Sequence, residues 1–183
     1  MEPLETMKTN PPLYLIGYRC TGKSTTGQLL ATLMGFAFMD TDRVIEEKFK
    51  TTIEEMIHQK GWDYFRKKEK QVLLDLGHLS NTIVATGGGI VLDSENRKFI
   101  QTHGICVWLY ADGDTIVKRL LADENTSESR PRFSDDCLTL ETQKTLALRT
   151  PLYRELSQIQ IDTSTHSPKE AASIIKRRIS HVR

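Results

Sequence analysis

Eight residues near the start of the chain place glycines, a lysine and a serine in the spacing G-x-x-x-x-G-K-[ST], from Gly17 to Ser24. An apolar run that predicts a buried strand precedes them (13–16), and an amphipathic helix is predicted after them (25–34). In this context the glycines let the backbone wrap a phosphate, and the helix start offers free N–H groups. Lys23 can reach the β- and γ-phosphates, and the Ser24 hydroxyl can ligate Mg²⁺. The pattern predicts a nucleoside triphosphate site; the alternative is a glycine turn that only joins strand to helix.

Two carboxylates, Asp40 and Asp42, follow the second predicted strand. In open α/β sheets, ligands lie beyond the carboxyl ends of the strands. One carboxylate there can hold Mg²⁺ through water, and the other can accept a proton from the attacking hydroxyl of a second substrate. The alternative is structural, with Asp42 capping a helix that starts at Arg43.

Two arginines further along the chain have the properties of anion-binding groups. Arg66 lies three residues before Glu69 on a predicted helix, so the pair can fix the guanidinium for two parallel hydrogen bonds to a ligand carboxylate. Taken alone, this is also the pattern of an ordinary helix salt bridge. Arg149 stands two residues before Pro151, and because proline cannot continue the preceding helix, we expect Arg149 at a fixed helix exit.

Gly87, Gly88 and Gly89 follow the third predicted strand, and three successive glycines are costly in entropy there. They make sense where a ligand or the γ-phosphate presses against the backbone, although a glycine turn without function is the alternative. A polar stretch at 123–136 carries Arg130 and, after a proline, Arg132. Loops this long inside a domain are usually functional or disordered, and the arginines favour a lid over a phosphate rather than a solvated surface loop.

Strand-like and helical patterns alternate along the chain, which predicts an α/β sandwich of three layers: a parallel sheet with helices on both faces. The predicted strands are 13–16, 37–39, 82–85, 105–110 and 158–162. The predicted helices are 23–34, 43–49, 52–60, 64–79, 94–103, 114–122, 138–148 and 168–181. Ser167, Pro168 and Glu170 form a capping-box pattern at the start of the last helix.

The composition of the 183-residue chain fits one domain, with residues 1–11 as a flexible leader. We find no apolar run long enough to span a bilayer and no apolar segment of a signal peptide. The net charge of +1 predicts neither a nucleic-acid nor a membrane partner. Three widely spaced cysteines fit reduced thiols in the cytoplasm better than a disulfide framework, and the five histidines lack metal-ligand spacing.

Five blocks in order together resemble the shikimate kinase family, relatives of the nucleoside monophosphate kinases. The blocks are the phosphate loop (Gly17 to Ser24), Asp40-x-Asp42, Phe65-Arg66-x-x-Glu69, the three glycines with Arg130-Pro131, and Arg149-x-Pro151-Leu152-Tyr153. The resemblance implies a P-loop fold with five parallel strands in the order 2-3-1-4-5. It also implies transfer of the ATP γ-phosphate to the 3-hydroxyl of shikimate, a step toward chorismate and the aromatic amino acids, by an enzyme that is usually monomeric.

The resemblance also implies roles for single residues. Asp42 resembles the carboxylate that hydrogen-bonds the ring hydroxyls and can act as base, and Arg66 and Arg149 resemble the pair that grips the shikimate carboxylate. The three glycines resemble the wall of the acceptor pocket, and Ser24 and Asp40 resemble the Mg²⁺ contacts. Lys23 and Arg130 would act on the transferring phosphate. The expected ATP site comprises Gly17, Thr21, Gly22, Lys23, Ser24, Thr25, Arg119, Arg130 and Pro168.

Three positions depart from the family pattern: Cys20 where a small residue is frequent, Arg132 where leucine is frequent, and His166 where arginine is frequent. Two rival functions remain. Another small-molecule kinase of this fold, such as gluconate kinase, has no evident need for two arginines aimed at one acceptor carboxylate. A non-catalytic nucleotide switch of the GTPase type would carry D-x-x-G and N-K-x-D, and neither motif occurs in the sequence.

Overall fold

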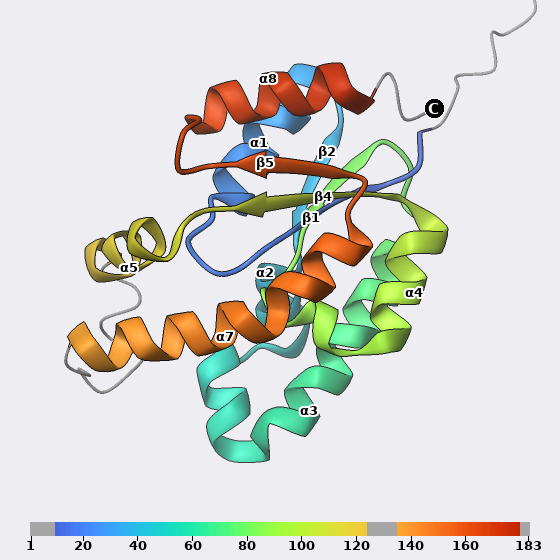
Figure 1. Cartoon of the computed structure of the whole chain (residues 1–183). Helices are drawn as coiled ribbons and strands as arrows, with labels where there is room; N and C mark the ends of the chain where they lie inside the picture. Colours follow the sequence, from blue (N-terminus) through green and yellow to red (C-terminus); the bar gives the residue numbers. More distant parts are fainter. Residues whose placement is uncertain (1–9, 124–134, 180–183) are drawn as a thin grey trace, which may run out of the picture.

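Five parallel strands form the central sheet of the computed structural model, which describes residues 10–123 and 135–179 (Figure 1). Their order is β2-β3-β1-β4-β5, as the resemblance implied, so β1 lies in the middle of the sheet. The strands are β1 (Leu13–Ile16), β2 (Ala37–Asp40), β3 (Thr82–Ala85), β4 (Ile105–Tyr110) and β5 (Ile159–Asp162). The phosphate loop therefore leaves the sheet at its centre, beside the loops that follow β3 and β4.

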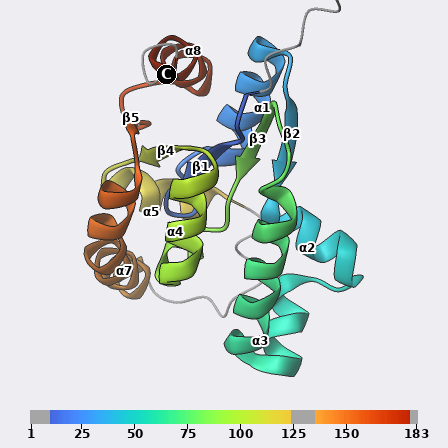
Figure 2. The ribbon, with the colours of Figure 1, turned by 90° about the vertical axis from the view of Figure 1, so that its right-hand side faces the viewer.

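Helices cover both faces of the sheet, as Figures 1 and 2 show from two directions. On one face lie α1 (Lys23–Met34) and α8 (Pro168–Ile179). On the other lie α3 (Ile53–Leu76), α4 (Ser94–His103) and α7 (Asp135–Leu156), with α2 (Thr41–Phe49) against α3. The helix α5 (Gly113–Ala122) follows β4 and packs on α7, and the short 3₁₀ helix η1 (Ile90–Leu92) follows β3.

The alternation of side chains along β1 explains the two cores. Tyr14 and Ile16 point into the cluster under α3, α4 and α7, while Leu13 and Leu15 point into the cluster under α1 and α8. All four side chains are buried, as expected of a parallel strand covered on both faces. This double burial makes β1 a rigid base for the loop that follows it.

The structure corrects several predicted element boundaries. Residues 52–60 and 64–79 were predicted as separate helices, but α3 runs through both, with a kink at Gly61, whose φ is 80°. The helix predicted at 138–148 instead starts at Asp135, inside the expected lid, and continues through Pro151 to Leu156. Pro151 removes one backbone hydrogen bond from the helix. Burial of the Tyr153 and Leu156 side chains stabilises the last turn and offsets that loss. Arg149 thus lies within a helix and not at its exit.

Other predictions of local structure are confirmed. The capping box at α8 is present, with the Ser167 amide donating to Glu170 at 2.8 Å and the Glu170 amide donating to the Ser167 hydroxyl at 3.3 Å. Across residues 10–123 and 135–179, no helix is both long and apolar enough to cross a bilayer.

Candidate active site

The loops after β1, β2 and β3 meet helices α3 and α7 around a cavity of about 200 Å³, which we call the acceptor pocket. Its lining includes every residue that the sequence predicted to bind the acceptor: Asp42, Arg66, Gly87, Gly88, Gly89 and Arg149. Parallel strands place their carboxyl ends at one edge of the sheet, which explains how Asp42 and the three glycines converge, while α3 and α7 bring Arg66 and Arg149 to the same edge. The structure therefore brings the predicted acceptor residues together.

In the phosphate loop, the ammonium of Lys23 lies over the loop's own backbone. Its Nζ donates to the carbonyl oxygens of Gly17 at 2.9 Å and Tyr18 at 2.8 Å. Burial lowers the pKa of Lys23, and the nearby carboxylates Asp42 and Asp40 oppose that effect. Gly22, with a φ of 82°, precedes the first turn of α1, whose N–H groups face the loop. The arrangement provides a cation and backbone donors for a phosphate.

Asp40 joins the phosphate loop to the start of α2. Its Oδ2 accepts a hydrogen bond from the Ser24 hydroxyl at 2.6 Å, and its Oδ1 accepts one from the Asp42 amide at 3.1 Å. Asp40, and not Asp42, is therefore the cap of α2, which leaves the Asp42 side chain available for another role. A hydroxyl beside a carboxylate is the hard oxygen donor set that suits Mg²⁺, which binds through few protein ligands plus water and phosphate.

Asp42 is a buried carboxyl group in a negative environment. Its Oδ1 is buried and has no hydrogen-bond partner in the part of the chain that the structure describes. Burial, followed by the charges of Asp40 and Glu69, raises its pKa to about 6, although Lys23 counteracts them. A carboxylate with this pKa is a better proton acceptor than an exposed aspartate and is still ionised at neutral pH.

Arg66 and Glu69 form the predicted pair on α3, with Nη1 and Oε2 2.6 Å apart. The Glu69 side chain is only 1% exposed, and burial raises its pKa, whereas Arg66 lowers it. A Cβ on Gly89 would overlap the Arg66 guanidinium, and one on Gly87 would lie 2.8 Å from oxygens of both Asp42 and Glu69. A side chain at either position would displace the charged groups that line the pocket.

Helix α7 is hydrogen-bonded to the glycine wall, which consists of Gly87, Gly88 and Gly89, through one carbonyl group. The Gly88 oxygen accepts hydrogen bonds from Arg149 Nη1 at 3.1 Å and from the Tyr153 hydroxyl at 2.5 Å. Burial raises the pKa of Tyr153 to about 12, so this hydroxyl remains a donor at neutral pH. The Nε of Arg149 is buried and has no hydrogen-bond partner among the residues that the structure describes. The bond from Nη1 holds the Arg149 guanidinium against the Gly88 carbonyl and leaves part of its donor capacity for a ligand.

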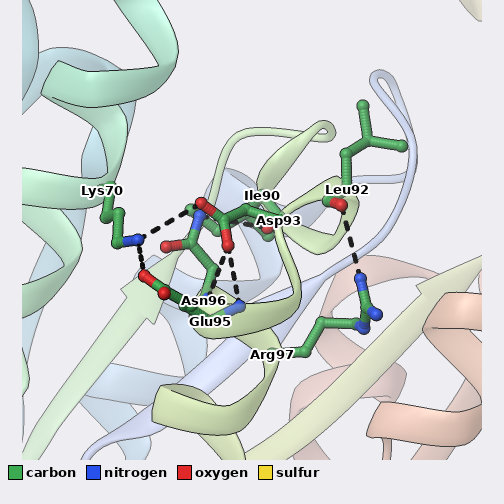
Figure 3. A network of polar contacts seen from close by, with 7 residues as sticks. All are labelled: Lys70, Ile90, Leu92, Asp93, Glu95, Asn96 and Arg97. Carbon is green, nitrogen blue, oxygen red and sulfur yellow. Dashed lines mark hydrogen bonds and ion pairs between the residues drawn. The ribbon is translucent and has the colours of Figure 1, made fainter.

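A polar network behind the glycine wall holds η1 in place (Figure 3). Arg97 of α4 donates to the carbonyl of Val91 at 2.6 Å, and Asn96 donates to that of Ile90 at 3.3 Å. Asp93 caps α4 and also accepts from Lys70 of α3, which contacts Glu95 as well. The backbone that follows the glycines is thus bonded to α4, and α4 is bonded to α3. These bonds position the glycine wall relative to α3, the helix that carries Arg66.

A second cavity of about 520 Å³, the nucleotide cavity, lies on the other side of the phosphate loop. Its lining includes the predicted ATP residues Thr21, Gly22, Thr25, Arg119 and Pro168. Arg119 donates to the carbonyl oxygens of Cys20 at 3.2 Å and Thr163 at 2.6 Å. Its guanidinium therefore joins two backbone segments, and Pro168 lines the same cavity. A cavity of this size at the end of a phosphate loop can accept a nucleoside.

Some functional contacts were not predicted from the sequence. Thr41 accepts a hydrogen bond from the Gly87 amide at 3.0 Å, which links α2 to the glycine wall. The Thr163 hydroxyl accepts a hydrogen bond from Arg119 Nη1. The bonds of Tyr153 were also missed, although its place one helical turn after Arg149 is a signal that could have found them. The predicted lid residues Arg130, Pro131 and Arg132 lie outside the described residues.

The shikimate kinase family model matches residues 19–180 of this chain. The chain belongs to the shikimate kinase family. A shikimate kinase of Syntrophus aciditrophicus is 37% identical over 98% of this chain and 96% of that protein. The structure of a shikimate kinase from Acinetobacter baumannii in complex with shikimate is 32% identical, covers 95% of each chain and superposes with a TM-score of 0.86. A gluconokinase from Sinorhizobium meliloti shares only 13% identity and a TM-score of 0.58 over 94% of this chain and 95% of that one, a likeness of fold alone.

Proposed function

We propose that this kinase transfers the γ-phosphate of ATP to the 3-hydroxyl of shikimate, giving ADP and shikimate 3-phosphate. The observation that carries the proposal is the convergence of Arg66, Arg149 and buried Asp42 on one pocket beside the phosphate loop. Two fixed guanidinium groups suit a carboxylate, and a buried carboxylate suits a hydroxyl. Shikimate, a carboxylic acid with ring hydroxyls, offers both.

In the proposed reaction, the arginines orient the acceptor and Asp42 acts on its hydroxyl. Arg66 and Arg149 hold the carboxylate, so the ring has one orientation against the glycine wall. Asp42 accepts the proton of the attacking hydroxyl. Holding the two reactants in line removes orientational entropy, which can lower the barrier by several kcal/mol.

Lys23 and the backbone amides at the start of α1 stabilise the negative charge on the transferring phosphoryl group. Ser24 and Asp40 would hold Mg²⁺, which would neutralise negative charge on the nucleotide phosphates. Arg119 and Pro168 would flank the adenine. For Arg130, which lies outside the described residues, the proposal rests on the sequence: a lid arginine that reaches the phosphates when the lid closes.

We further propose that the enzyme acts as a monomer in the cytoplasm. The free thiols of Cys20, Cys106 and Cys137 are compatible with a reducing compartment. Light scattering on a size-exclusion column checks the monomer, with a molar mass near the 20.9 kDa of one chain as the expected result.

ADP release measured with shikimate, gluconate or no acceptor tests the reaction. We expect ADP release to depend on shikimate and on Mg²⁺. We also expect gluconate to be a poor acceptor, because it lacks the ring that would lie against the glycine wall. Turnover with gluconate equal to that with shikimate would favour the rival kinase. ATP binding without ADP release with either acceptor would favour a nucleotide switch.

A further inference from the structure

The acceptor pocket contains a third arginine that has no role in the account above. Arg19 belongs to the phosphate loop, yet its side chain lines the acceptor pocket together with Asp42, Arg66 and Arg149. Its Nε and Nη2 atoms are buried and form no hydrogen bond with any of residues 10–123 and 135–179. The Cζ atom lies 5.7 Å from the centre of the Tyr18 ring, so an aromatic face is its near neighbour.

The other two arginines of the pocket are held differently. Arg66 has Glu69 at 2.6 Å, and Arg149 has the Gly88 carbonyl at 3.1 Å. Leaving a buried donor without a partner costs about 1–3 kcal/mol, and more when the group is charged. Two such donors on one guanidinium are therefore a cost to the free enzyme, and a ligand anion that pairs them would remove it.

The position of Arg19 restricts which anion that is. Its backbone belongs to the loop that surrounds the phosphates, and its amide nitrogen would lie 3.4 Å from a Cβ on Gly88. Arg19 thus stands where the phosphate loop meets the glycine wall, on the boundary between donor and acceptor sites. The acceptor carboxylate already has two arginines in the proposed function. The group that crosses this boundary during the reaction is the phosphoryl group.

We propose that Arg19 binds the phosphoryl group on the acceptor side, as the phosphate monoester of the product. The inference rests on the proposed function. As the bond from the γ-phosphorus to the ADP oxygen breaks, a bond to the acceptor oxygen forms, and the hydroxyl proton passes to Asp42. The phosphate then lies on the Arg19 side of the pocket, where the planar guanidinium matches its oxygens with two hydrogen bonds. Arg19 thereby distinguishes product from substrate.

Calorimetric titration of shikimate 3-phosphate and of shikimate into wild type and Arg19→Met tests this role. We expect Kd for the product to rise about tenfold or more in the variant, because each tenfold step corresponds to one good charged hydrogen bond. Kd for shikimate should change by less than about threefold, since no phosphate is present in that ligand. Arg19→Lys keeps the charge but loses the two parallel hydrogen bonds, so its Kd for shikimate 3-phosphate should lie between those of wild type and Arg19→Met.

Arg177→Met is the matched control, because it removes an exposed arginine from α8, away from the acceptor pocket. It should bind both ligands like wild type. Equal weakening of both ligands by Arg19→Met would place Arg19 on the acceptor carboxylate, and unchanged binding of both would make it a solvated side chain; either result overturns the inference. Arg19→Gln replaces the methionine variant should that variant melt well below wild type. Failure of wild type itself to bind shikimate would instead contradict the proposed function.

Discussion

In the acceptor pocket, buried charged atoms lack partners among the described residues, whereas in the nucleotide cavity the Arg119 guanidinium is bonded to backbone. Asp42 Oδ1, Glu69 Oε1 and Arg149 Nε have no hydrogen-bond partner among the described residues. Arg119, by contrast, donates to the Cys20 and Thr163 carbonyls. Both regions border the phosphate loop, and the difference lies in whether the protein itself satisfies its charges.

This difference implies two kinds of recognition. Unpaired buried charges reject a ligand that cannot pair them, because such a ligand leaves the desolvation cost in place. The acceptor pocket should therefore be selective. A guanidinium already bonded to backbone offers mainly a flat surface for a base. We expect the nucleotide cavity to discriminate less sharply, and variants on the two sides to separate the two substrates.

The largest expected effect is that of Asp42→Asn. The amide keeps the size of the side chain but cannot accept the proton of the attacking hydroxyl. Positioned bases contribute about 10²–10⁴-fold, so kcat should fall by that amount while the Kd of ATP stays near that of wild type. Steady-state assays with a nucleotide titration provide the measurement. Retention of more than about a tenth of wild-type kcat would remove Asp42 from the role of base.

Next in size are Arg66→Lys and Arg149→Lys. Lysine keeps the positive charge and loses the two parallel hydrogen bonds to a carboxylate. Each change should raise KM for shikimate by about 10- to 100-fold, at about 1.4 kcal/mol per tenfold step, and KM for ATP far less. The two KM values from one data set give the comparison. Equal effects on both substrates would mean that these arginines support the fold rather than the acceptor.

The pH dependence follows from the buried carboxyl group of Asp42. Its pKa is raised to about 6, and only the deprotonated form accepts a proton. Activity should therefore be constant above this pH and lost as pH falls through it, with kcat/KM for shikimate dropping about tenfold per unit below. A pH–rate profile between pH 5 and 8, at about constant ionic strength, measures this. A profile that is flat down to pH 5 would contradict the raised pKa.

On the nucleotide side, Arg119→Met should act on ATP alone. The change removes the bonds to Thr163 and Cys20 and the flat surface beside Pro168. Because these groups are partly exposed, we expect KM for ATP to rise only about three- to tenfold, with the Kd of shikimate unchanged. Calorimetric titration with ATP and with shikimate measures the Kd of each substrate separately. Weaker shikimate binding in this variant would show that the two regions are not independent.

Periodicity predicted the strands and a parallel sheet, whereas the strand order and the acceptor roles of Asp42, Arg66 and Arg149 were implied by the resemblance to the shikimate kinase family. The sequence did not predict the path of α7 through Pro151, since the gain from burying Tyr153 and Leu156 depends on tertiary packing. Nor did it predict that Asp40 caps α2. That choice depends on backbone geometry, which two aspartates two residues apart leave open. The unpaired atoms of Arg19 could be found only from the structure.

The smallest effect belongs to Tyr153→Phe, which tests whether the glycine wall is positioned from α7. The variant removes one neutral hydrogen bond to the Gly88 carbonyl and keeps the buried ring. Such a bond contributes about 0.5–1.5 kcal/mol, so KM for shikimate should rise about two- to tenfold. We expect kcat to stay within about twofold, because Tyr153 does not line the acceptor pocket. Tyr110→Phe, on β4 outside that pocket, is the matched control and should leave both constants unchanged. A fall in kcat with unchanged KM would mean that the bond matters during transfer and not for placing the acceptor.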